Sequence, residues 1–146
     1  KDKLFFVDKY YKPKLPLNLT KYLLKFANSS IDVSDGLIDD LTKMINRQNL
    51  SFHLFENKIP VSNKLSNLIK KQRLNKINLI SNGDDYQILF TASKDKRRII
   101  KNIALKNRIK ITNIGKIQNL VKKSSIVDEK NMKTMPKNKG YIHEFY

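Results

Sequence analysis

The sequence predicts a single α+β domain. Short apolar segments with strand character alternate along the chain with longer segments of helical periodicity. The length of 146 residues suits one domain that buries a real core. No apolar run approaches the roughly 18 residues of a membrane span, so no membrane segment is expected. These three observations favour a globular domain in which helices and strands are interspersed.

The first 16 residues are predicted to be a linker or entry segment. Pro13 and Pro16 break regular structure there, and residues 3–6 suit a short strand or the end of a linker. The expected organisation is therefore a linker over 1–16 and one α+β domain over 17–146.

Apolar spacing predicts the helices. Residues three and four positions apart share one face of a helix, and such apolar stripes recur along the chain. The expected helices cover 18–27, capped by Asn18 or Thr20, then 36–48, 61–71 and 94–107.

The strands are predicted from β-branched and aromatic residues and from apolar–polar alternation. They are expected over 29–33, 51–55, 86–92 and 110–118, with the alternating segment 51–55 as an outer strand. Gly115 inside the last strand indicates a bulge or a close backbone approach. Residues 126–127 are expected to pair with that strand as a hairpin partner.

Composition restricts the possible functions. The net charge is +17, but 25 of the 30 cationic residues are Lys and they are scattered along the chain. Nucleic-acid binders more often use Arg and interleaved aromatic residues, so a basic solvated surface is favoured over a nucleic-acid site. Cysteine is absent, which excludes disulfides and thiolate chemistry. With no signal-peptide pattern, the expected location is the cytoplasm.

The first candidate site is the turn that follows the strand over 29–33. Residues 31–37 read Ile-Asp-Val-Ser-Asp-Gly-Leu, which places Asp32, Ser34 and Asp35 at a sharp strand-to-helix turn. Two carboxylates and a hydroxyl there suit Mg²⁺ and phosphate oxygens. The alternative is that Ser34 or Asp35 only caps the helix. Asp39 and Asp40 are expected to face solvent and to complement the helix dipole.

The second candidate site is the loop before the strand over 86–92. It reads Asn-Gly-Asp-Asp-Tyr over residues 82–86, with two adjacent carboxylates, Asp84 and Asp85. Gly83 would allow positive φ, so an ordinary tight turn is the alternative. His53 stands alone in a predicted strand and belongs to no catalytic or metal-binding pattern.

Taken together, the two loops resemble those of thiamine-monophosphate kinases. That family carries Val-Ser-Asp-Gly-Leu and then Gly-Gly-Glu-Asp-Tyr-Glu-Leu-Leu-Phe-Thr, and this chain has Asn-Gly-Asp-Asp-Tyr-Gln-Ile-Leu-Phe-Thr about 45 residues after the first motif. Residues 114–117 (Ile-Gly-Lys-Ile) and 140–143 (Gly-Tyr-Ile-His) extend the similarity. The ordered resemblance covers roughly residues 12–145.

The resemblance implies a fold and a reaction. The fold is the C-terminal domain of the aminoimidazole-ribonucleotide-synthetase-like superfamily, with a mixed or antiparallel sheet and helices on one side. The reaction is ATP-dependent phosphorylation of thiamine phosphate to thiamine diphosphate with Mg²⁺. The partner is an N-terminal domain of the same protein, absent here, and the full-length protein is expected to be a homodimer.

The resemblance also implies residue roles. Asp32 and Asp35 would be Mg²⁺ ligands, Ser34 would contact the nucleotide, and Asp84 and Tyr141 would contact the thiamine substrate. The family Glu is Asp84 here and the first Gly of that loop is Asn82. Two alternatives remain: another ATP-dependent member of the superfamily, such as a selenophosphate-synthetase-like or purine-synthesis-like enzyme, and a non-catalytic basic module that binds nucleic acid.

Overall fold

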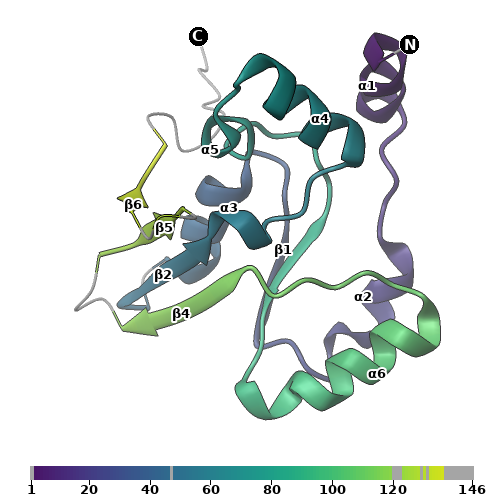
Figure 1. Ribbon diagram of the computed structural model, residues 1–146. Helices are drawn as coiled ribbons and strands as arrows, with labels where there is room; N and C mark the ends of the chain where they lie inside the picture. The colour runs from purple at the N-terminus through teal and green to yellow at the C-terminus, as the bar shows by residue number, and fades with distance from the viewer. Residues whose placement is uncertain (1, 47, 120–122, 129, 131, 137–146) are drawn as a thin grey trace, which may run out of the picture.

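A computed structural model describes residues 2–46, 48–119, 123–128, 130 and 132–136 (Figure 1). Helices and strands alternate along most of it, as the α+β prediction requires. In order, the elements are α1 (Asp2–Tyr11), α2 (Leu17–Leu23), β1 (Ser29–Asp32), α3 (Leu37–Ile45), β2 (Leu50–Phe55), the 3₁₀ turn η1 (Glu56–Lys58), α4 (Asn63–Gln72), α5 (Lys76–Leu79), β3 (Ile88–Thr91), η2 (Lys94–Lys96), α6 (Arg97–Asn107), β4 (Gly115–Asn119), β5 (Ser125–Val127) and β6 (Lys133–Thr134).

The strands form two separate sheets. A four-stranded mixed sheet has the order β4-β2-β5-β6, in which β2 is antiparallel to β4 and parallel to β5, and β5 is antiparallel to β6. The other sheet is an antiparallel pair of β1 and β3, with Asp32 opposite Ile88. The mixed sheet expected from the resemblance is confirmed.

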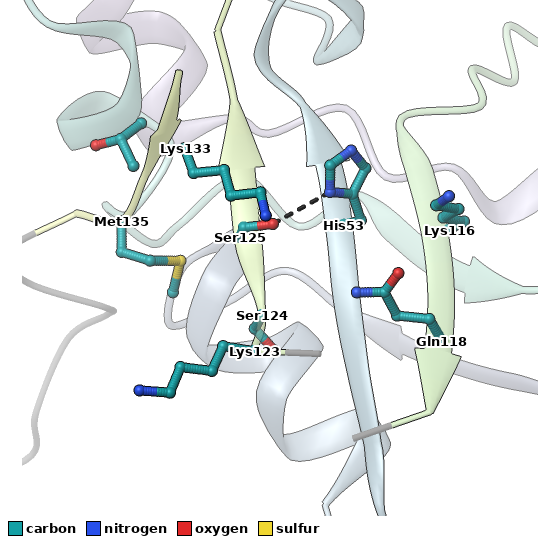
Figure 2. Close-up of a pocket in the computed structure, with 9 residues that line it drawn as sticks. His53, Lys116, Gln118, Lys123, Ser124, Ser125, Lys133 and Met135 are labelled. Atoms are coloured by element: carbon teal, nitrogen blue, oxygen red, sulfur yellow. Dashed lines mark hydrogen bonds between the residues drawn. The ribbon is translucent and has the colours of Figure 1, made fainter. Parts of the chain in front are cut away.

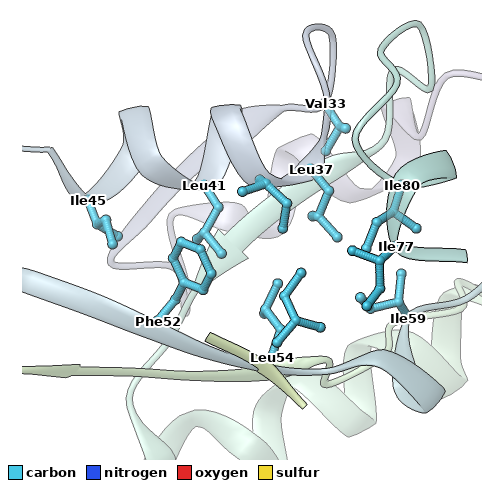
Figure 3. Close-up of a cluster of buried hydrophobic side chains, with 11 residues drawn as sticks. Val33, Leu37, Leu41, Ile45, Phe52, Leu54, Ile59, Ile77 and Ile80 are labelled. Atoms are coloured by element: carbon cyan, nitrogen blue, oxygen red, sulfur yellow. The ribbon is translucent and has the colours of Figure 1, made fainter. Parts of the chain in front are cut away.

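The hydrophobic core lies between α3 and one face of the four-stranded sheet (Figure 3). Helix α3 contributes a stripe at spacings of three and four residues, and β2 and β5 contribute alternate positions. Apolar residues of the segment from η1 to the end of α5 cover one side of this core. The buried members are Val33, Leu37, Ile38, Leu41, Ile45, Phe52, Leu54, Ile59, Ile77, Ile80 and Ile126.

Helices α2 and α6 lie beside the β1–β3 pair rather than over this core (Figure 1). The ring of Phe26, just after α2, packs against that of Phe90 on β3 at a centroid distance of 5.0 Å. The Tyr22 hydroxyl donates a hydrogen bond of 2.7 Å to Asn107 Oδ1 at the end of α6. The two helices are thus joined to each other and to β3.

Four local predictions were wrong. Residues 3–6 lie in α1, a helix with no buried residue, and not in a strand. Strand β2 is interior to its sheet, because it pairs with both β4 and β5. Residues 126–127 therefore pair with β2 and β6, and not with β4. Helix α2 begins after Pro16 without a side-chain cap from Asn18 or Thr20.

Gly115 marks a close backbone approach, as its position in a predicted strand indicated. It pairs with Leu54 at the start of β4, and a Cβ at this position would overlap the His53 carbonyl oxygen. None of the helices within the described ranges combines the length and the apolar character needed to cross a bilayer.

We predict that Ile38→Ala lowers the free energy of unfolding by about 2–5 kcal/mol, because it removes a side chain with 0% exposure from the centre of the core. Urea denaturation monitored by circular dichroism measures the change. Leu105→Ala on α6 is the control, since Leu105 is 69% exposed and its truncation should change stability by less than about 0.5 kcal/mol. Equal effects of the two substitutions would contradict the proposed position of the core.

Candidate functional site

The first motif forms the turn between β1 and α3. Gly36, the last residue before α3, has φ 122° and ψ 146°, a backbone conformation that favours glycine. A Cβ on Gly36 would overlap the Ser81 carbonyl oxygen, so the position is also sterically restricted. Gly36 itself is the N-cap of α3 and no side chain caps the helix. The capping interpretation of Ser34 and Asp35 is therefore wrong.

A buried carboxylate holds this turn in shape. Asp40, in the first turn of α3, is 1% exposed. Its Oδ2 accepts hydrogen bonds from the backbone amides of Ser34 (3.0 Å), Asp35 (3.0 Å) and Gly36 (3.2 Å). The prediction that Asp40 faces solvent was wrong, because three consecutive amides of the turn need an acceptor and its carboxylate reaches back to supply one.

Three carboxylates converge at the start of α3. Asp35, Asp39 and Asp40 place oxygen atoms within 4.8 Å of one another. The ammonium group of Lys43 forms an ion pair with Asp35 and lies 2.7 Å from Asp39 and 3.6 Å from Asp40. Hydrogen bonds to Asp35 and Asp39 raise the pKa of Lys43 well above its usual range. The negative charge of the turn is therefore partly neutralised by a cation of the same helix.

The second motif lies directly against the first. The Asp84 amide donates to the Ser34 carbonyl (2.8 Å) and the Tyr86 amide donates to the Val33 carbonyl (2.8 Å). The Val33 amide in turn donates to the Gln87 carbonyl at 2.8 Å. The two loops, about 45 residues apart in sequence, thus form one site.

Glycine is needed in the second loop for a different reason from the predicted one. Positive φ occurs at Asp84 (66°) and Tyr86 (49°), and not at Gly83. A Cβ at Gly83 would overlap the Ser34 carbonyl oxygen. The glycine is therefore required for the contact between the loops, while Asp84 and Tyr86 carry the strained backbone.

Two side chains of the second loop have shifted pKa values. The Tyr86 hydroxyl donates to Asp84 Oδ1 at 3.0 Å, and this bond, followed by the negative charge of Asp84, raises the pKa of Tyr86. The pKa of Asp85 is raised, chiefly by desolvation of its carboxyl group and secondly by the negative charge of Asp84. Part of the residue is nevertheless exposed to solvent. The loop thus presents crowded negative charge.

Only some of the predicted site residues lie in the acidic cluster. Asp35 lies in the acidic cluster and Ser34 lies half-buried between the loops. Asp32 is exposed at the end of β1 and lies outside the Asp35, Asp39 and Asp40 cluster. It is paired with Ile88 at the start of β3, which places it beside the end of the second loop. Tyr141 lies outside the described residues.

Sequence reasoning missed the roles of Asp40 and Lys43. Two patterns in the sequence could have indicated them. An acidic residue in the first turn of a helix often accepts from amides just before the helix. A Lys placed three residues after Asp40 and four after Asp39 lies on the same helix face as both.

Comparison with known proteins identifies relatives of this chain. No protein-family model matches it. The thiamine-monophosphate kinase of Buchnera aphidicola subsp. Acyrthosiphon pisum is 35% identical over 143 residues, which cover 95% of this chain and 42% of that protein. The thiamine-monophosphate kinase of Aquifex aeolicus is 32% identical over 94 residues, which cover 64% and 31%.

A solved structure gives the same result. AaThiL, complexed with AMPPCP and TMP, matches with a TM-score of 0.72 and 25% identity over 97% of this chain and 42% of that chain. The chain thus spans less than half the length of these relatives. The fold and the resemblance predicted from the two motifs are confirmed.

We predict that Asp40→Ala destabilises the fold by about 2–4 kcal/mol, because it leaves three turn amides without their acceptor. Urea denaturation measures the loss, and hydrogen exchange should accelerate at the amides of residues 34–36. The matched control is Asp39→Ala, which removes only a partly exposed ion pair and should cost less than about 1 kcal/mol. Unchanged exchange at the turn in Asp40→Ala would refute the anchoring role.

Proposed function

We propose that this chain is the C-terminal domain of a thiamine-monophosphate kinase and forms one half of an ATP-dependent enzyme that converts thiamine phosphate to thiamine diphosphate. The observation that supports this most directly is the bonding between the two motif loops through the carbonyls of Val33 and Ser34. We further propose that the complete protein acts in the cytoplasm as a homodimer and that an N-terminal domain supplies the rest of the site.

The turn fits a divalent cation by the chemistry of its donors. Mg²⁺ prefers oxygen ligands and usually takes one or two carboxylates from the protein. Asp35 offers such a carboxylate beside Asp39 and Asp40, and the Lys43 ammonium already occupies the cluster as a stand-in cation. When bound, Mg²⁺ would neutralise phosphate charge during an in-line transfer. We propose Asp35 in this cluster as one ligand from this chain and Asp32, which lies outside the cluster at the end of β1, as the other.

The remaining residues would position the two substrates. Ser34 has a hydroxyl at the junction of the loops, where it would donate to a phosphate oxygen of the nucleotide. Asp84 is exposed, and its carboxylate is oriented by the Tyr86 hydroxyl, so it would contact the thiamine end together with Tyr141. No general base is required, because an acceptor phosphate oxygen is already anionic at neutral pH. The chemistry therefore depends on positioning and charge.

We predict that the 146-residue chain alone has no kinase activity and that activity appears when the N-terminal part of a relative is joined to it. A chimera would carry the segment of the Buchnera aphidicola relative that precedes the matched region, followed by this chain. Thiamine diphosphate formation from ATP and thiamine phosphate is the readout. In the chimera, Asp35→Asn should lower kcat/KM by about 10²-fold or more, whereas Asp95→Asn, an exposed acid on η2, should not. Substantial turnover by the isolated chain would refute the two-domain proposal.

We also predict that Lys43→Met increases the affinity of the turn for a divalent cation. The ammonium group competes with the cation for Asp35 and Asp39, and an exposed ion pair is worth up to about 1 kcal/mol, so the Kd should fall by about 2- to 5-fold. Mn²⁺ binding followed by electron paramagnetic resonance measures this without turnover. Lys70→Met on α4 controls for net charge, and Asp35→Asn should weaken binding. A weaker affinity in Lys43→Met would contradict the competition.

A further inference from the structure

A concave surface lies on the face of the four-stranded sheet that points away from α3. Successive side chains of a strand point to opposite faces. Phe52 and Leu54 of β2 point into the core, so His53 points to the other face. His53 pairs with Lys116 on β4 and with Ser125 on β5, which places these three residues in one row across the sheet.

The groove around this row is large enough for a small molecule. Its volume is about 630 Å³, within the usual range of ligand sites. We refer to it as the sheet groove, and it is lined by His53, Lys116, Gln118, Lys123, Ser124, Ser125, Lys133, Thr134 and Met135 (Figure 2). In that view, Lys133 and Lys116 lie on opposite sides of His53.

The charged side chains among the described lining residues of the sheet groove are all lysines. No Asp or Glu is among its described lining residues. Within the part of the chain that the structure describes, Lys116, Lys123 and Lys133 form no ion pair with a carboxylate. A concave surface with cations of one sign focuses the electrostatic potential and attracts anions. The charge here is therefore available to a ligand.

The centre of the groove is built rather than loosely arranged. His53 Nδ1 lies 3.1 Å from the Oγ of Ser125, a buried residue, and the His53 ring packs edge-on against Phe55 at a centroid distance of 5.1 Å. The Phe55 ring also contacts a cation, since Lys58 Nζ lies 4.4 Å from its centroid. The His53 imidazole, held in place between Lys116 and Lys133, is suited to hydrogen-bond phosphate oxygens.

From this arrangement we propose that the sheet groove binds a small anion that carries two or more phosphate groups. Three lysines from separate segments can contact more than one phosphate, and the volume of the groove suits a small molecule. The site is distinct from the acidic turn, because the core and the sheet itself separate the two. It needs no divalent cation, whereas phosphate binding at the turn would require one.

Isothermal titration calorimetry of the 146-residue chain with pyrophosphate, and separately with ATP, tests the proposal in buffer with EDTA and without Mg²⁺. The Lys116→Gln/Lys133→Gln double variant should bind both ligands about tenfold more weakly or worse. The matched control is Lys70→Gln/Lys71→Gln on α4, which removes the same charge away from the groove. Its affinity should stay within about twofold, and circular dichroism checks that both variants are folded.

Nuclear magnetic resonance locates the ligand. Pyrophosphate should shift the ring protons of His53 in the wild-type chain. Similar affinities for pyrophosphate and ATP would assign recognition to the phosphates, and tighter ATP binding would add the nucleoside, both in agreement with the proposal. Equal losses in the two double variants, or an unperturbed His53, would overturn it. Tighter, groove-dependent binding of a single-stranded RNA would also overturn it in favour of a nucleic-acid site.

Discussion

The contact between the two motif loops is the constraint on which the rest of the site depends. The carbonyls of Val33 and Ser34 accept amides from the second loop, and Gly83 passes so close to Ser34 that any side chain would separate the loops. Because both loops are short and each adjoins a strand of the β1–β3 pair, this contact fixes the relative positions of the carboxylates at Asp35 and Asp84.

Charge balance explains why so many acids can gather at one turn. Asp40 is buried but saturated by three backbone amides, so its charge contributes to the fold. Asp35 and Asp39 are partly exposed and share Lys43. The turn therefore contains one structural carboxylate and two that can exchange an internal cation for an external one.

Much of this arrangement could be predicted from the sequence, and the failures have physical causes. The helices α3, α4 and α6 follow from apolar spacing, and the two loops follow from their motifs. The pairing of β5 with β2 could not be predicted, because strand order is decided by packing between distant segments. The role of Asp40 was missed because an Asp in a first helical turn is usually solvated and complements the helix dipole, and this common case was preferred to acceptance from the preceding amides.

The second loop departs from the family pattern, and this affects both the length of one acidic side chain and the strain of the backbone. The family Glu position is Asp84 here, and its backbone is left-handed with φ 66°. Asp adopts this conformation more readily than most residues, so the shorter side chain lowers the strain of the loop. It loses one methylene of reach, while the Tyr86 hydroxyl restricts the carboxylate to one orientation. The carboxylate of Asp84 therefore lies nearer the backbone than that of a Glu would and is held by Tyr86. In the proposed role of Asp84, the substrate would have to come correspondingly closer to the loop.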